Sequence, residues 1–260
     1  MSWRLRVTSR APALYRDPGL YDLIHHDGTD DEVWLLDRLS KIHGCGVKTA
    51  LEPGCGTGRY LAGLLRRGWA VEGYDVSRVM TAYARKRLSA WGSRAEVSLA
   101  DMTSYRPARR FGLIFNLLST FRHLMSDRQA LAHLRLMSGA LEPGGIFVLG
   151  MDLALYGGEE PEEEVWKCRR GRNRATHVVM SLPASALERR ERIINFVTTP
   201  AGRHERVLES SYDLRSYDAA QAAGLIARSP LRLVQAYGYD GKPASLDGPE
   251  RALWLVLKNR

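Results

Sequence analysis

The sequence lacks several features that would place it in other classes of protein. Its three cysteines, Cys45, Cys55 and Cys168, are odd in number and show no Cys-x-x-Cys spacing. They therefore predict neither a disulfide framework nor a zinc site. The first residues contain no apolar leader, and the longest apolar stretch, near residues 113–121, is too short to span a membrane. These absences favour a cytoplasmic globular protein.

Charge is less evenly spread than the rest of the composition. The formal net charge is +9, with 38 Lys and Arg against 29 Asp and Glu, which raises nucleic acid as a partner. The excess is local, because residues 48–110 contain 12 basic and 5 acidic residues whereas residues 155–215 contain 11 and 10. The basic residues fall where solvated helices and loops are expected. A nucleic-acid substrate therefore stays open but is not favoured.

Residues 51–59, LEPGCGTGR, form the most informative stretch of the chain. Gly54, Gly56 and Gly58 alternate between an apolar run and a helix-like run, which predicts a strand, a turn without Cβ atoms, and a helix N-terminus whose N–H groups can meet a ligand. The spacing differs from the G-x-G-x-x-G loop of dinucleotide sites. The Glu52 carboxylate at the strand end suits a ligand that carries a positive group.

Alternating strand and helix patterns on both sides of this loop predict an α/β fold with a doubly wound, mostly parallel, seven-stranded sheet. A chain of 260 residues can bury one such core plus an insertion. Residues 1–16 are expected to be irregular, and two helices should follow at 20–26 and 30–43, the second capped by Asp30 or Asp31. The seven strands are expected at residues 48–51, 70–74, 95–99, 113–117, 146–151, 231–239 and 252–257.

The character of the sequence changes after residue 156. Four β-leaning stretches separated by turn residues predict an antiparallel arm, and they lie at 165–170, 176–182, 189–198 and 206–214. We therefore divide the chain into residues 1–156, with the N-terminal helices and the Rossmann-like core, 157–215, the arm, and 216–260, the helix and strands that complete the sheet.

Five motifs in chain order resemble those of class I S-adenosylmethionine (SAM) methyltransferases. They are the glycine loop, the Gly73-x-Asp75-x-Ser77-x-x-Met80 segment, Ala100-Asp101-Met102, Asn116 in the fourth strand, and Leu141-x-Pro143-Gly144-Gly145. The resemblance implies that Asp75 binds the ribose hydroxyls, that Met80 packs on the adenine, and that Asp101 and the next backbone N–H meet the adenine edge. The cofactor-binding residues expected from it are Tyr15, Tyr21, Glu52, Gly54, Gly56, Gly58, Asp75, Val76, Met80, Asp101, Met102 and Asn116.

Two further stretches resemble the nucleotide-sugar N-methyltransferases that make dimethylamino sugars for macrolides. These are residues 20–25, LYDLIH, with Tyr15 upstream, and residues 119–124, STFRHL. The resemblance implies that His123 faces the acceptor amine as a base, with Tyr15 or Tyr21 orienting the acceptor or the SAM carboxylate. The alternative is a histidine that pins its loop. Residues 151–156, MDLALY, depart from the Trp-rich stretch of those enzymes.

We therefore expect transfer of a methyl group from SAM to a nitrogen or oxygen of a small molecule, with an amine or amino-sugar-like acceptor favoured and S-adenosylhomocysteine (SAH) as product. The alternatives are methylation of RNA or protein and a non-catalytic subunit that binds SAM or SAH. No metal is expected, because no third and fourth ligand is spaced to join His25, His26 and Asp27. A homodimer through the arm is a further expectation.

Overall fold

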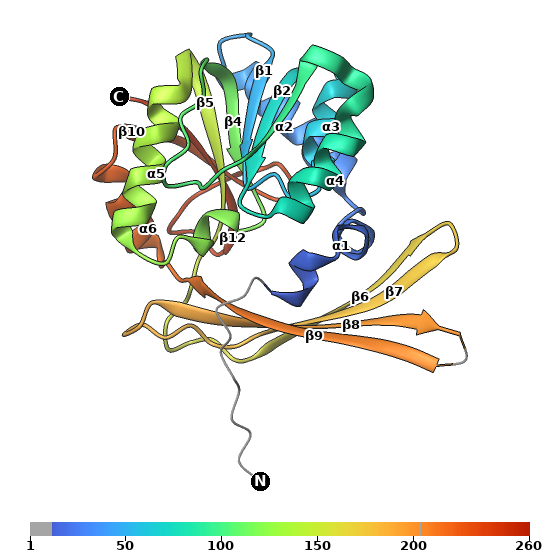
Figure 1. Ribbon diagram of the computed structural model, residues 1–260. Coiled ribbons are helices and arrows are strands. Elements are labelled where there is room, and N and C mark those ends of the chain that lie inside the picture. Colours follow the sequence, from blue (N-terminus) through green and yellow to red (C-terminus); the bar gives the residue numbers. More distant parts are fainter. Residues whose placement is uncertain (1–11, 203) are drawn as a thin grey trace.

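The computed structural model describes residues 12–202 and 204–260, which form a body and a long β arm (Figure 1). The helices of the body are η1 (Ala13–Arg16), α1 (Pro18–Ile24), α2 (Thr29–His43), α3 (Arg59–Arg66), α4 (Arg78–Leu88), η2 (Ser89–Arg94), η3 (Thr120–His123), α5 (Asp127–Ala140) and α6 (Ala219–Ala227). Its strands are β1 (Thr49–Pro53), β2 (Ala70–Asp75), β3 (Ala95–Leu99), β4 (Phe111–Asn116), β5 (Leu141–Asp152), β10 (Leu231–Gly238), β11 (Pro243–Ala244) and β12 (Ala252–Asn259).

The strands of the body form one sheet in the order β11-β10-β12-β5-β4-β1-β2-β3. Strands β3, β2, β1, β4 and β5 are parallel, whereas β12, β10 and β11 pair antiparallel. The expected α/β fold is therefore confirmed, with eight strands in place of seven because the two-residue strand β11 pairs with the edge of β10. Ligands of such sheets bind beyond the carboxyl ends of the parallel strands.

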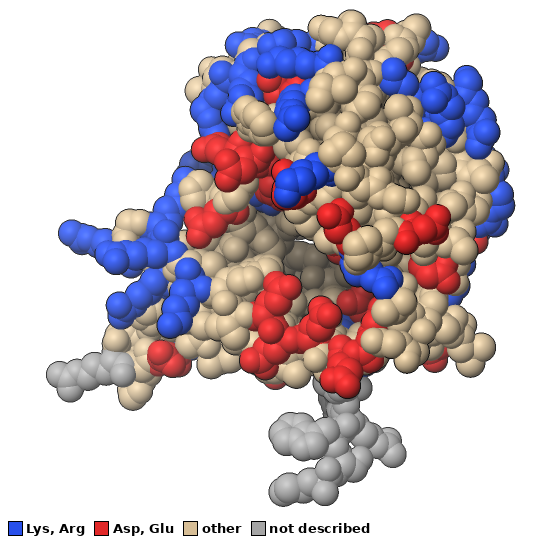
Figure 2. Space-filling view, turned by 180° about the vertical axis from the view of Figure 1, so that it is seen from behind, with Lys and Arg blue, Asp and Glu red and all other residues tan. Residues whose placement is uncertain are grey.

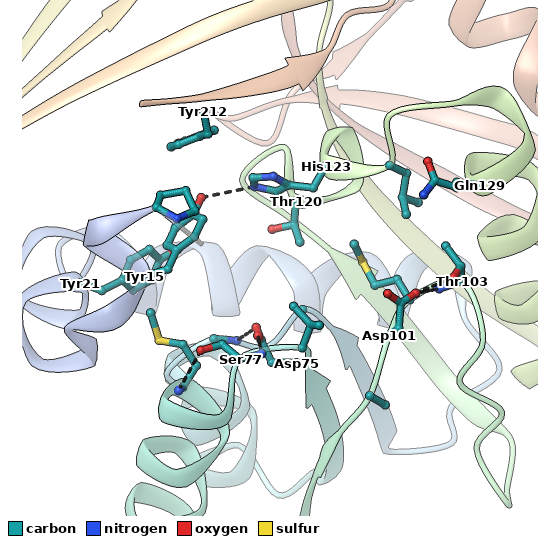
Figure 3. Close-up of a pocket in the computed structure, with 18 residues that line it drawn as sticks. Tyr15, Tyr21, Asp75, Ser77, Asp101, Thr103, Thr120, His123, Gln129 and Tyr212 are labelled. Carbon is teal, nitrogen blue, oxygen red and sulfur yellow. Dashed lines mark hydrogen bonds between the residues drawn. The ribbon is translucent and has the colours of Figure 1, made fainter. Parts of the chain in front are cut away.

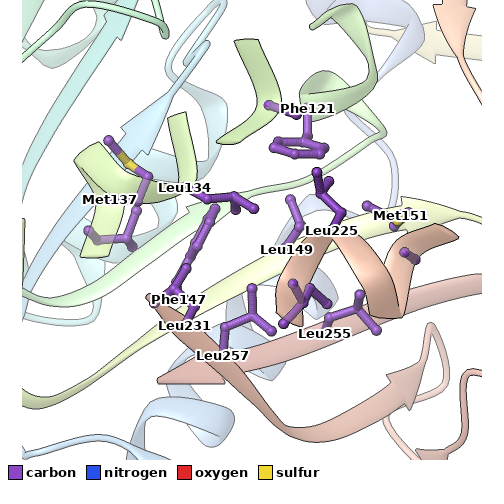
Figure 4. Packing of buried hydrophobic residues seen from close by; sticks show 14 of the residues in the cluster. Phe121, Leu134, Met137, Phe147, Leu149, Met151, Leu225, Leu231, Leu255 and Leu257 are labelled. Atoms are coloured by element: carbon purple, nitrogen blue, oxygen red, sulfur yellow. The ribbon is translucent and has the colours of Figure 1, made fainter. Parts of the chain in front are cut away.

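Helices cover both faces of this sheet, and each face has its own apolar core. On one face, Leu134 of α5 and Leu225 of α6 pack with Phe147 and Leu255 (Figure 4). On the other face, α2, α3 and α4 contribute to a second cluster around Leu36. The strands add the side chains that point to this face of the sheet. β4, and β5 from Ile146 to Met151, are buried on both faces, and their sequences there are nearly continuous apolar runs.

The arm is a separate four-stranded antiparallel sheet inserted after β5. Its strands are β6 (Glu162–Arg170), β7 (Asn173–Ser181), β8 (Arg190–Ala201) and β9 (His204–Arg215), paired in sequence order. The prediction of an antiparallel arm is confirmed. Figure 1 shows η1 and α1 lying between this sheet and the body, and Leu14 and Ile24 pack there against Cys168, Ala175 and Val197.

The N-terminal part departs from expectation in its helix cap. Helix α2 begins after Gly28, which has a left-handed backbone (φ +78°), so the prediction of Asp30 or Asp31 as the cap is wrong. Both carboxylates lie instead in the first turn, where they interact favourably with the helix dipole. The expected irregularity of residues 1–16 falls mostly outside the described residues, and Ala13–Arg16 form a 3-10 turn. Across residues 12–202 and 204–260, no helix combines the length and apolarity needed to cross a membrane.

Candidate functional site

A cavity of about 380 Å³ lies at the carboxyl edge of the parallel strands, where the glycine loop, the ends of β2 and β3, and η3 meet (Figure 3). The N-terminal segment and the arm close its other side. Its lining residues are Pro12, Tyr15, Tyr21, Gly54, Gly56, Asp75, Val76, Ser77, Met80, Ala100, Asp101, Met102, Thr103, Thr120, His123, Leu124, Gln129 and Tyr212. The structure thus brings together most of the residues that the sequence predicted.

The glycine loop forms the expected turn between β1 and α3. Gly54 has φ +67°, and a Cβ atom there would lie 2.6 Å from the Thr120 Cγ2 atom, so any side chain would collide with the segment after β4. Gly58 has φ +70° and serves as the N-cap of α3 without lining the cavity. Only residues without a Cβ adopt these conformations without strain. The loop therefore leaves its backbone open to a ligand.

Asp75 at the end of β2 ties the glycine loop to the next helix. One carboxylate oxygen accepts a hydrogen bond from the Gly56 N–H at 2.9 Å, and the other accepts one from the Ser77 N–H at 2.7 Å. Burial raises the pKa of Asp75, although these backbone hydrogen bonds oppose the shift. Each carboxylate oxygen has a second lone pair, so Asp75 can still accept from the hydroxyl groups of a ligand.

Glu52 is a buried carboxylate that the protein leaves incompletely satisfied. Its side chain is 6% exposed, and its Oε2 atom has no hydrogen-bond partner among the described residues. It lines a small cavity beside the main one, which shares Tyr21, Gly54 and Gly56 with it. Burial raises the pKa of Glu52 well above its usual range, against the opposing effect of Arg59. A cationic group placed beside Glu52 would satisfy this carboxylate.

Four of the other predicted cofactor residues belong to the main cavity. Val76, Met80, Asp101 and Met102 line the cavity. Asp101 also has a turn role, because its Oδ1 accepts from the Thr103 N–H at 2.7 Å and from the Thr103 hydroxyl at 2.5 Å.

Asn116 lies outside the lining residues. It is fully buried, and its amide donates to the Pro53 carbonyl at 2.8 Å, which fixes the end of β1 against β4.

His123 in η3 lies on the side of the cavity that faces the arm. The Tyr15 hydroxyl lies 3.3 Å from its Nε2 atom, and the Tyr212 ring lies 5.4 Å from its ring, centroid to centroid. Burial, with a smaller contribution from the neighbouring Arg122 charge, lowers the pKa of His123 to about 4. The imidazole is therefore neutral at pH 7 and can accept a hydrogen bond or a proton.

Arg122 joins the loop of His123 to the arm. This buried side chain donates from Nε to the Arg215 carbonyl at 2.9 Å and pairs with Glu191, which lies on β8. Its guanidinium also lies 3.6 Å from Asp152, which accepts a hydrogen bond from the Ser119 hydroxyl. The backbone of Ser119 is left-handed (φ +54°) and is held by these contacts. The position of His123 thus depends on the arm.

Sequence reasoning missed several lining residues, of which Tyr212 is the most informative. It lies on β9 opposite Ile193 of β8, on the face of the arm that meets the body. The alternation of Ser210, Tyr212 and Leu214 places them on one face, but nothing in the sequence says which face meets the cofactor cavity. Among the residues that the structure describes, no group of His, Cys, Asp and Glu side chains is arranged to hold a metal ion.

Comparison with known proteins agrees with this geometry. Residues 50–145 match the family described as a methyltransferase domain. A curated relative, the dTDP-3-amino-3,6-dideoxy-alpha-D-glucopyranose N,N-dimethyltransferase of Streptomyces fradiae, is 30% identical over 133 residues, which are 50% of this chain and 51% of the relative. The chain thus spans about half the length of this relative.

Solved structures extend the likeness to nearly the whole chain. DesVI of Streptomyces venezuelae superposes with a TM-score of 0.77 at 20% identity, covering 93% of this chain and 96% of that one. SAM-bound CalS10 of Micromonospora echinaspora, an amino pentose methyltransferase, gives 0.70 at 20% identity, covering 89% and 92%. We conclude that this chain has the class I methyltransferase fold, that its residues 50–145 match the methyltransferase-domain family, and that it resembles the amino-sugar N-methyltransferases.

Proposed function

We propose that the protein transfers the methyl group of SAM to the nitrogen of a small amino-sugar-like acceptor. The observation that carries this proposal is the arrangement of two adjoining cavities, the cofactor-sized one at the glycine loop and a larger one between the arm and the body. Tyr15, Tyr21 and Tyr212 line both, and His123 lies at this boundary. A methyl donor in the first cavity would face an acceptor in the second.

The residues of the first cavity, together with Glu52 in the small cavity beside it, fit the chemical groups of SAM. We assign the ribose hydroxyls to Asp75, the adenine to Val76, Met80 and the Asp101–Met102 turn, and the amino group of the methionine part to the unsatisfied carboxylate of Glu52. Tyr15 and Tyr21 are left to orient the methionine carboxylate or the acceptor. SAM supplies an activated methyl group on a sulfonium, so the protein needs mainly to align the acceptor and exclude water.

His123 is proposed as the base. An ammonium cannot attack, so the acceptor nitrogen must first lose a proton. The neutral imidazole of His123 can take that proton, directly or through the hydroxyl of Tyr15. The nitrogen lone pair then forms a bond to the methyl carbon as the carbon–sulfur bond breaks, and both electrons of that bond stay on the sulfur of SAH.

The test is methyl transfer from SAM labelled with deuterium in its methyl group, offered with dTDP-linked and free amino sugars. Mass spectrometry with fragmentation should find the label on nitrogen, together with one SAH for each methyl transferred. Label on an oxygen would contradict the nitrogen assignment. Failure of the protein to bind SAM or SAH in calorimetry would contradict the whole proposal.

We also propose that residues 157–215 act as a cover for the acceptor and as a contact between two copies of the chain. The outer face of the arm supports the second role, because its paired residues Val165, Val178, Met180, Ile194 and Phe196 form an apolar surface that faces away from the body. Analytical ultracentrifugation should find a dimer, and Phe196→Glu should convert it to monomer with SAH affinity unchanged. A wild-type monomer at micromolar concentration would refute this contact.

A further inference from the structure

The larger cavity lies between the arm and the body and measures about 980 Å³. In the space-filling view from behind, it opens as a hollow above the arm, with acidic side chains along its lower rim (Figure 2). Its arm wall consists of alternate residues of β6, β7, β8 and β9, among them Trp166, His177 and Tyr212. We call it the acceptor chamber.

Carboxylates dominate the charge of the acceptor chamber. Among the described residues, eight carboxylates and two arginines line it, the carboxylates being Asp27, Asp31, Glu32, Asp152, Glu162, Glu164, Glu191 and Asp240. One of the arginines, Arg122, is already paired with Glu191 and Asp152. His25 and His177 add no charge at neutral pH, because burial lowers the pKa of both imidazoles.

Four of these carboxylates are available to a ligand. Asp27, Asp31, Glu162 and Glu164 form no ion pair with any described residue. Glu162 and Glu164 alternate along the inner face of β6, so both project on the side of the chamber.

His177 provides an independent sign that the chamber takes a polar ligand. Its side chain is 1% exposed, and its Nε2 lies 2.9 Å from the Asn195 Oδ1, which can only accept, so Nε2 carries the proton. Nδ1 is therefore an acceptor, and it has no partner among the described residues. An N–H or O–H group of a ligand would satisfy it. The nearby rings of His25 and Trp166, with centroids 6.1 and 5.2 Å from that of His177, suit a cation beside them.

We propose that the acceptor is a polycationic amino sugar or aminocyclitol without a nucleoside diphosphate. This inference rests on the proposed function, and it concerns only which acceptor the same site takes. A diphosphate in the chamber would face the four unpaired carboxylates, and of the two lining arginines only Arg251 is not already in an ion pair with a described residue. Further ammonium groups on the acceptor would instead pair with those carboxylates. The chamber thus selects a cationic acceptor by attraction and rejects a diphosphate by repulsion.

The test measures acceptor binding to the SAH-loaded protein by calorimetry, with kanamycin, spermidine and dTDP-3-amino-3,6-dideoxyglucose as probes. Kanamycin should bind at least tenfold more tightly than the dTDP-linked sugar. The double variant Glu162→Gln/Glu164→Gln should weaken kanamycin binding at least tenfold while SAH affinity stays as in the wild type. The matched control is Glu163→Gln, because Glu163 lies between them on the opposite face of β6, and it should bind kanamycin as the wild type does.

Tighter binding of the dTDP-linked sugar, or an unchanged kanamycin affinity in the double variant, would overturn the cationic acceptor and leave methyl transfer itself standing. Absence of binding by both kanamycin and spermidine would overturn it as well. Absence of SAH binding by the wild-type protein would instead overturn the proposed function. Spermidine binding as tightly as kanamycin would refute the sugar part of the inference.

Discussion

Replacement of His123 by Asn is expected to lower the single-turnover rate of methyl transfer by about 100- to 10,000-fold, the usual contribution of a general base. The affinity for SAM should not change, because His123 lies on the arm side of the cavity, across from Asp75 and Asp101 (Figure 3). Asn has a similar polar shape but cannot take up a proton at neutral pH. Rapid-quench kinetics, calorimetry and the thermal midpoint, measured on the same preparations, check the expectation.

The matched control is His26→Asn, at an exposed histidine outside the cavity, and its rate should equal that of the wild type. A lowered thermal midpoint in His123→Asn, with a proportionate loss of SAM binding and no specific defect in rate, would make His123 a residue that pins its loop.

The pH dependence of the wild-type rate gives a second check on His123. Its pKa of about 4 leaves the imidazole deprotonated throughout the neutral range. The single-turnover rate at saturating acceptor should therefore stay level across the neutral range, because His123 takes the proton of the bound ammonium, without the inflection near pH 6.5 that an unperturbed histidine would cause. An inflection near pH 6.5 that is lost in His123→Asn would contradict the buried, neutral imidazole.

Asp75→Ala is expected to weaken SAM binding at least tenfold, or by about 1.4 kcal/mol or more. The substitution removes the acceptor for the ribose hydroxyls and also the partner of the Gly56 and Ser77 N–H groups. Calorimetry with SAH measures the loss. Asp75→Asn is the milder change, because its amide oxygen still accepts one of the two backbone hydrogen bonds while the negative charge is gone.

Glu96→Ala removes an exposed carboxylate from the neighbouring strand β3 and serves as the control, with unchanged affinity. An Asp75→Ala protein that binds SAH as tightly as the wild type would show that the ribose does not lie at Asp75.

The cofactor half of the site could be predicted from sequence because its determinants are local. Gly54, Gly56 and Gly58 favour a tight turn between a strand and a helix, whatever the rest of the chain does. Asp75 ends the next strand of the same sheet. The carboxyl ends of parallel strands meet at one edge, so these residues come together without knowledge of any distant contact.

The arm wall of the acceptor half could not be predicted because it depends on how the arm lies against the body. Period-two alternation puts Glu162, Glu164 and Trp166 on one face of β6, but the sequence does not say which face is turned inward. The same holds for Tyr212. Local signals also failed at the start of α2, where the left-handed Gly28 took the place of an Asp cap, and at β11, which is too short to leave a pattern.

The most direct test of the account is a crystal structure of the protein with SAH. We expect the ribose hydroxyls within hydrogen-bond distance of Asp75, the adenine beside Met80, and the sulfur directed at the boundary formed by Tyr15, His123 and Tyr212, with the acceptor chamber beyond it. SAH bound with its sulfur turned away from that boundary, or bound within the acceptor chamber, would contradict the proposal that the two cavities hold donor and acceptor.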